Sequence, residues 1–314
     1  MIPDALAPDA SSILPDAAAD NWVDRYAPAA LRPWLKLGRF DRPAGIWLLM
    51  LPGWQGIALA DASAGRAPNF WHLLLFAIGA AAMRAAGCAY NDIVDRDIDA
   101  KVARTAGRPV ASGAIGVRQA WLYVAGLCLV GLLVLVQLPL PAIVLGGLSL
   151  ALVAAYPFMK RITWWPQAWL GLTFNWGALM GYAAGHGGLA LPGVLLYASG
   201  FFWTLGYDTL YAVQDLEDDA LAGVKSSARR LGSKVRLGVG VFYAASAVLA
   251  LAAGVVADLS NLFLVLVLAF AAHLALQVKA FKPGDGALAL KLFRSNRDAG
   301  LYLFAALALG AWQG

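Results

Sequence analysis

Three acids and an asparagine are spaced so that a single helix would bring them together. Asn91 and Asp92 are followed by Asp95 and Asp99, at intervals of three and four residues. Residues at these intervals share one helix face, with Cβ atoms about 5–6 Å apart, where like charges repel. The segment therefore predicts a bound cation that neutralises the carboxylates. Asp97 lies off this face, and we expect it to be solvated.

A second acidic segment repeats this spacing later in the chain. Asp208, Asp215 and Asp219 share one helix face, and Tyr211 falls on the same side. Carboxylate oxygens without cysteine or histidine are the ligands that Mg²⁺ prefers, and it usually binds one or two carboxylates together with substrate phosphates. The two segments therefore predict Mg²⁺ as the cofactor and a phosphorylated substrate.

Cationic side chains accompany both acidic segments. Arginine and lysine next to Mg²⁺ are the groups that bind and neutralise a diphosphate. Arg84 lies inside an apolar run, seven residues before Asn91, so it shares the helix face of the first acids. The residues expected to contact a diphosphate are Arg84, Arg104, Arg108, Lys160 and Lys225.

The chain that carries these residues is too apolar for a soluble domain. Hydrophobic residues make up 61% of its 314 residues and charged residues 14%, against about 45–50% and about 25% in soluble domains. The composition predicts an integral membrane protein. It excludes a disulfide scaffold, because Cys88 and Cys128 both lie in apolar runs. It also excludes a nucleic-acid-binding protein, because the net charge of +5 follows the membrane topology and forms no basic face.

Nine apolar runs approach the roughly 20 residues that a membrane-spanning helix needs. They cover residues 43–61, 70–91, 117–138, 140–158, 166–185, 191–214, 236–256, 259–281 and 298–314. Of the 24 lysines and arginines, 22 lie before the first run, or in or at the edges of the connections after the even-numbered runs. Positive charge collects on the cytoplasmic side. We therefore expect the N-terminus and both acidic segments in the cytoplasm of a bacterium, and the C-terminus across its inner membrane, in the periplasm.

The N-terminal segment differs from the rest of the chain. Residues 1–38 are rich in alanine, aspartate and proline, and they lack the charged start and apolar core of a signal peptide. We expect a cytoplasmic arm followed by a short amphipathic helix over Trp22–Leu37 at the inner interface. Residues 39–314 would form one transmembrane domain, with two related four-helix halves and a ninth helix.

At the acidic segments the sequence resembles the UbiA superfamily of intramembrane prenyltransferases. The family pattern N-D-x-x-D-x-x-x-D begins at Asn91, and its second pattern, D-x-x-x-D, begins at Asp215. Further stretches resemble one branch, the 4-hydroxybenzoate polyprenyltransferases of ubiquinone synthesis. These stretches are Arg39–Pro43, Met83–Cys88, Arg104–Pro109, Tyr156–Arg161 and Tyr207–Tyr211. The similarity leaves the N-terminal arm unmatched.

The resemblance implies a fold and a reaction. The fold would be all-α, with nine transmembrane helices around a central cavity that opens sideways to membrane lipid. The reaction would be Mg²⁺-assisted loss of diphosphate from a polyprenyl diphosphate, followed by attack of the 4-hydroxybenzoate ring on the allylic cation.

The resemblance also implies roles for individual residues. One Mg²⁺ would be held by Asn91, Asp92, Asp95 and Asp99, and another by Asp215 and Asp219. Arg161 would bind the carboxylate of the acceptor, and Asp208 or Asp215 would take up a proton. The residues expected to contact substrate are Arg39, Arg42, Tyr156, Arg161, Tyr207 and Tyr211, with Phe174 as a further aromatic candidate.

Two other functions are compatible with parts of this pattern. A related prenyltransferase with another acceptor, such as homogentisate, a different phenolic acid or a porphyrin, would share the acidic segments. A divalent-cation transporter would also carry acids in membrane helices. Such a transporter should place them near the middle of the membrane, whereas both acidic segments here lie at one end of their helices.

Overall fold

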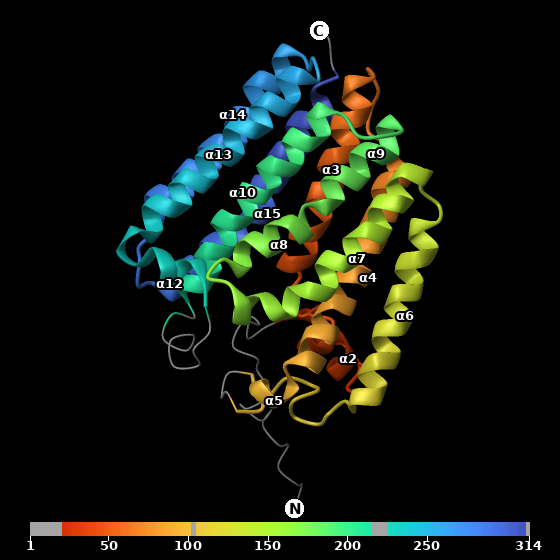
Figure 1. Ribbon diagram of the computed structural model, residues 1–314, viewed down its shortest axis with the longest axis vertical. Coiled ribbons are helices and arrows are strands. Elements are labelled where there is room, and N and C mark those ends of the chain that lie inside the picture. Colours follow the sequence, from red (N-terminus) through yellow and green to blue (C-terminus); the bar gives the residue numbers. More distant parts are fainter. Residues whose placement is uncertain (1–20, 102–104, 215, 217–224, 312–314) are drawn as a thin grey trace, which may run out of the picture. The chain divides into compact units, whose positions relative to one another are not determined.

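The computed structural model describes residues 21–101, 105–214, 216 and 225–311, and for Lys160 it describes the backbone alone. Within these ranges all regular structure is helical and no strand occurs (Figure 1). The expected all-α class is confirmed.

Each predicted apolar run corresponds to a helical segment. The long helices are α3 (Ala44–Ser63), α4 (Phe70–Val94), α6 (Val117–Leu135), α7 (Leu140–Ile162), α10 (Leu191–Val213), α13 (Val235–Val256), α14 (Asn261–Ala280) and α15 (Gly286–Leu309). The predicted run 166–185 is divided into α8 (Pro166–Phe174) and α9 (Trp176–His186). The described part of the chain contains five helical stretches that are long and apolar enough to cross a membrane. These are Phe70–Val94, Val117–Leu135, Leu140–Met159, Ser227–Val256 and Asn261–Ala280.

The last helix begins earlier than the sequence predicts. The apolar run was expected from residue 298, but α15 already starts at Gly286. Its first turns carry Lys291, Arg294 and Arg297, which dilute the apolar signal. They also bury Leu292 and Asn296, so this half of the helix is packed even though its composition is polar.

The N-terminal segment forms two short helices where one was expected. They are α1 (Trp22–Tyr26) and α2 (Arg32–Leu37). Pro28 lies between them, and because proline has no backbone N–H and clashes with the preceding turn, it interrupts a continuous helix. Two further helices are short. Helix α5 (Arg96–Asp99) follows α4, and α12 (Ser227–Leu231) precedes α13. A single 3₁₀ turn, η2 (Gly232–Lys234), joins α12 to α13.

The chain folds as two compact units, each formed from two stretches of sequence. The first comprises residues 1–46 and 81–132, and the second residues 47–80 and 133–314. In the first unit, Leu37 of α2 is buried in a small apolar core with residues of α4, of the following loop and of α6. The other members of that core are Ala89, Val110, Ile115 and Ala120. This core fixes α2 beside the acid-bearing end of α4.

The second unit is built around α10, which packs against α13, α8 and α15. At the break between α8 and α9, Asn175 donates from Nδ2 to the carbonyl of Gly171 (2.8 Å) and to the hydroxyl of Thr204 on α10 (2.7 Å). A backbone break between apolar helices leaves polar groups that water cannot reach, so protein groups must satisfy them. Asn175 does so here and ties the break to α10.

Candidate active site

The first acidic segment lies where α4 ends and α5 begins. The backbone N–H of Asp95 donates to the carbonyl of Asn91 (2.9 Å), and that of Asp99 donates to the carbonyl of Asp95 (2.8 Å), so helical spacing continues across the junction. Asp92, Asp95 and Asp99 are 1%, 0% and 6% exposed. The side chain of Asp97 is 82% exposed and pairs with Arg96. Burial therefore follows the predicted helix face, and Asp97 is solvated as expected.

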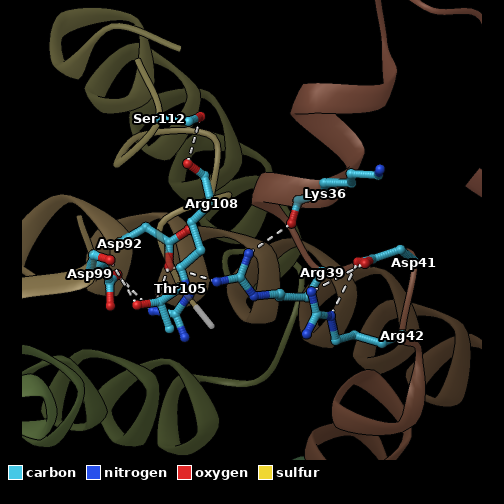
Figure 2. A network of polar contacts seen from close by, with 9 residues as sticks. All are labelled: Lys36, Arg39, Asp41, Arg42, Asp92, Asp99, Thr105, Arg108 and Ser112. Atoms are coloured by element: carbon cyan, nitrogen blue, oxygen red, sulfur yellow. Dashed lines mark hydrogen bonds and ion pairs between the residues drawn. The ribbon is translucent and has the colours of Figure 1, made fainter. Parts of the chain in front are cut away.

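Two arginines hold the buried carboxylates (Figure 2). Arg39 donates from Nη2 to Oδ1 of Asp92 (2.7 Å), and Arg108 donates from Nη1 to Oδ2 of Asp99 (2.7 Å). The same Arg108 nitrogen lies 3.5 Å from Oδ1 of Asp92. Arg108 therefore bridges two of the three acids, a pairing that the sequence does not predict.

One carboxylate oxygen in this cluster is buried but makes no hydrogen bond with the described residues. It is Oδ2 of Asp92, whose Oδ1 is the atom that faces the arginines. Leaving such an atom unsatisfied is costly, so it is the kind of position that a bound cation or water completes. The predicted Mg²⁺ ligands are oxygen donors, and this atom fits that role.

Burial and neighbouring charges act in opposite directions on the cluster. Burial raises the pKa of the Asp99 carboxyl, and the opposing effect of Arg108 leaves that pKa above its usual value, with Asp92 and Asp95 adding to the rise. For Arg39, burial lowers the pKa, but the charge and hydrogen bond of Asp92 together with the effects of Cys88 and Asp41 outweigh burial, and the pKa is raised. Arg39 therefore stays charged beside Asp92.

The loop after α5 is held in place by its own polar side chains. Thr105 donates from Oγ1 to the carbonyl of Asp99 (2.9 Å), and Ser112 donates from Oγ to the carbonyl of Arg108 (2.9 Å). These bonds fix the backbone on both sides of the bridge between Arg108 and Asp99. The sequence alone does not indicate Thr105 as a site residue. Its hydrogen bond to Asp99 becomes evident only in the folded structure.

Two other predicted cations belong to the same unit. Arg42 pairs with its neighbour Asp41, with Nη2 3.3 Å from Oδ2. Arg84 lies across Gly45, where a Cβ atom would come within 2.6 Å of the arginine Nε. A glycine is therefore needed at position 45 for Arg84 to lie in this place.

The second acidic segment begins in the last turns of α10, and only part of it is described. Asp208 and Tyr211 are half-buried on α10, whereas Asp215 and Asp219 lie outside the described residues. Tyr207 is 1% exposed, and its hydroxyl accepts a hydrogen bond from Thr204 (3.0 Å). Its ring packs against Phe293 of α15, with 5.8 Å between centroids, and Tyr211 packs against the same ring at 4.9 Å.

The remaining predicted site residues lie on or near α7. Arg161 is exposed in the last turn of α7, and Tyr156 is half-buried one and a half turns earlier. Lys225 donates to the carbonyl of Ile162 at the end of the helix (3.2 Å). Arg104 and the side chain of Lys160 lie outside the described part of the structure.

Within the described ranges, no three His, Cys, Asp or Glu side chains are grouped closely enough to hold a metal ion. Asp92, Asp95 and Asp99 share a buried face without forming such a group, and Asp215 and Asp219 are not described. The Mg²⁺ ligands inferred from the sequence therefore stay a prediction.

Comparison with known families identifies the chain. The profile described as the UbiA prenyltransferase family matches residues 49–311. The chain belongs to the UbiA prenyltransferase family. The resemblance at the acidic segments is thereby confirmed, and the protein is a multi-pass membrane enzyme of the prenyltransferase class.

Individual relatives extend this result. The Arabidopsis thaliana protein named 4-hydroxybenzoate polyprenyltransferase, mitochondrial, is 44% identical over 291 residues, which cover 92% of this chain and 71% of the relative. The apo structure of a UbiA homolog from Aeropyrum pernix K1 is similar with a TM-score of 0.69 and 28% identity, covering 83% of this chain and 96% of that one.

A UbiA homolog from Archaeoglobus fulgidus, solved bound to GPP and Mg²⁺, shares the fold with a TM-score of 0.66. Its identity is 20%, and the match covers 88% of this chain and 99% of that one. The expected UbiA fold is therefore confirmed.

Proposed function

We propose that this chain transfers a polyprenyl group from a polyprenyl diphosphate to the ring of 4-hydroxybenzoate, a step of ubiquinone biosynthesis. The observation that carries the proposal is the cluster of buried carboxylates and arginines at the end of α4, in a chain of this family. The name of the Arabidopsis relative supports the choice of donor and acceptor.

The proposed cofactor is Mg²⁺. Asn91, Asp92, Asp95 and Asp99 would hold one ion, and Asp215 with Asp219 a second. When bound, Mg²⁺ supplies positive charge that stabilises the departing diphosphate. The partnerless Oδ2 of Asp92 supports this assignment, as does the Mg²⁺ named in the Archaeoglobus structure.

The cations of this chain would bind the diphosphate and favour its departure. Arg108 lies within the acid cluster. Arg84 shares the helix face of the first acidic segment. Arg104, Lys160 and Lys225 are proposed as further contacts. As the bond between the allylic carbon and the diphosphate oxygen breaks, its electron pair leaves with the diphosphate. Fixed positive charges stabilise that developing charge without having to reorganise.

The acceptor would be held and deprotonated by residues of α7, of α10 and of the second acidic segment. Arg161 is proposed to bind its carboxylate, and Tyr156, Tyr207 and Tyr211 to contact substrate. A ring carbon forms the new carbon–carbon bond, and the proton that it carried passes to Asp208 or Asp215. The allylic cation must not meet water, and the burial of the acid cluster supports a site that excludes it.

The second candidate is a UbiA-type enzyme with another aromatic acceptor. The acidic segments would be the same in such an enzyme, so they do not separate the two functions. The relative's name favours 4-hydroxybenzoate. Family membership also removes the reason to consider a divalent-cation transporter.

The location of the enzyme is proposed from the distribution of charge. The N-terminus and both acidic segments would face the cytoplasm, and the C-terminus would face the periplasm of a bacterium. The Arabidopsis relative is named as mitochondrial.

The test uses membranes from cells that express the chain. They are supplied with a polyprenyl diphosphate and labelled 4-hydroxybenzoate, in the presence of Mg²⁺ or of EDTA. The expected result is a lipid-extractable prenylated acid that forms only with Mg²⁺. If a folded protein forms no such product with donors of several chain lengths, the choice of acceptor is wrong. Homogentisate and other phenols are then tested with the same donors.

A further inference from the structure

The residues just before α3 are folded onto the acid cluster. Asn21 caps α1 by accepting from the N–H of Asp24 (3.0 Å). Asp24 in turn pairs with Lys36 of α2 at 2.7 Å. Leu37 at the end of α2 is 0% exposed in the core of the first unit. Helices α1 and α2 are therefore linked to each other and anchored beside α4.

The turn after α2 adopts a backbone conformation that arginine rarely takes. Arg39 has φ of +59°, in the left-handed region that favours glycine. Costly conformations of this kind persist when surrounding contacts over-determine them, and they are concentrated at functional sites. The contacts that surround Arg39 therefore indicate what the turn is for.

Bonds from α1 and α2 surround this turn. Trp22 donates from Nε1 to the carbonyl of Phe40 (2.7 Å). The carbonyl of Lys36 accepts from the backbone N–H of Arg39 (3.1 Å) and from its Nη1 (2.9 Å). The other guanidinium nitrogen, Nη2, is left to reach Oδ1 of Asp92 (2.7 Å; Figure 2).

We propose that α1 and α2 are a positioning element for the acid cluster. Trp22 and the Asp24–Lys36 pair hold Arg39 in its left-handed conformation. Arg39 then fixes Asp92 through Oδ1, and the other oxygen, Oδ2, would be available to hold Mg²⁺. Outer partners that orient a ligand commonly control its affinity for the metal. The inference rests on the proposed function of Asp92. It concerns residues that precede the matched part of the family profile, which begins at residue 49.

The first test removes one hydrogen bond from the positioning element. Trp22→Phe keeps an aromatic ring but loses the N–H that holds Phe40. The matched control is Trp54→Phe, which removes the same kind of bond, to the carbonyl of Leu73 (2.9 Å), in the other unit. One readout is hydrogen exchange of the amides of residues 39–42. The other is calorimetric binding of inorganic diphosphate with Mg²⁺, which needs no acceptor.

We expect faster exchange at residues 39–42 and about two- to tenfold weaker diphosphate binding in Trp22→Phe, which matches the loss of one hydrogen bond. In Trp54→Phe both quantities should equal those of the wild type. Exchanging the charges of Asp24 and Lys36 in one double variant should restore most of the binding that either single change removes.

A second test asks whether Trp22 acts through Arg39. Arg39→Gly removes the guanidinium and tolerates a positive φ. Adding Trp22→Phe to it should weaken diphosphate binding no further. A full additional loss would overturn the proposal, as would equal losses in Trp22→Phe and Trp54→Phe. If 4-hydroxybenzoate proves not to be the acceptor, the proposed function fails, yet both readouts still decide the role of α1 and α2.

Discussion

At the scale of single residues, the chemistry depends on how three buried carboxylates are compensated. Asp92 and Asp99 lie against Arg39 and Arg108 at 2.7 Å. Removing such charges from water costs several kcal/mol each unless opposite charges and hydrogen bonds offset it. Buried charges with this energetic cost occur most often at functional sites.

The first prediction compares two neighbouring acids. Asp95→Ala should reduce turnover by at least about 100-fold, because it removes a proposed metal ligand. Asp97→Ala, a change of the same type on the exposed side of α5, should leave turnover within about twofold. Product formation is measured in membranes, and thermal unfolding in detergent checks that both variants are folded. Near-normal turnover of folded Asp95→Ala would remove this acid from the metal site.

At the scale of elements, buried polar side chains connect four helices of the second unit. Asn296 on α15 accepts from Nε1 of Trp203 on α10 (2.8 Å) and donates from Nδ2 to Oε1 of Gln277 on α14 (3.1 Å). Tyr243 on α13 donates to the same Gln277 oxygen (2.9 Å). In a membrane such bonds hold helices together, because lipid offers no hydrogen-bonding partner.

This network leads to a prediction about stability. Asn296→Leu should lower the free energy of unfolding by about 1–3 kcal/mol, because it leaves the Trp203 N–H buried without its acceptor. Ser295→Ala on the same helix is the control, since the Ser295 hydroxyl donates locally to the carbonyl of Leu292 (2.8 Å). Thermal unfolding in detergent measures both. Equal stability of the two variants would show that the network contributes little.

The first half of α15 supports the acid-bearing end of α10. Phe293 packs against both Tyr207 and Tyr211. Aromatic pairs of this kind contribute about 0.5–1.5 kcal/mol beyond the area they bury. We therefore predict that Phe293→Ala raises the KM for the polyprenyl diphosphate about two- to tenfold, and that Phe293→Tyr restores it.

The control for this prediction lies further along the same helix. Phe304 packs against Trp54, with ring centroids 5.4 Å apart. Phe304→Ala should leave the KM for the donor unchanged even if it lowers the unfolding temperature. A rise in KM of similar size in both variants would mean that Phe293 acts through general stability and not through the tyrosines.

At the scale of the whole molecule, the sequence predicts features that depend on local residue spacing better than contacts between residues far apart in the chain. The shared face of Asp92, Asp95 and Asp99 follows from helix geometry within a few residues, so it could be read from sequence. Arg39 and Asp92 are 53 positions apart, and no local rule pairs them. The early start of α15 was missed because its charged residues conceal a buried stripe. The break at Asn175 was missed because one residue barely alters the apolar signal.

The remaining prediction concerns the side of the membrane on which the site opens. A diphosphate head group cannot cross the apolar interior, so the donor must be supplied from the side that the acidic segments face. The distribution of lysine and arginine predicts the cytoplasm. We expect a membrane-impermeant thiol reagent to label Gly188→Cys, in the connection before α10, in intact cells. It should label Asp97→Cys after α4 only in permeabilised cells. Both variants are made with Cys128 replaced by serine, because that thiol is exposed. The reverse pattern of labelling would place the site on the opposite side and require a donor supplied from there.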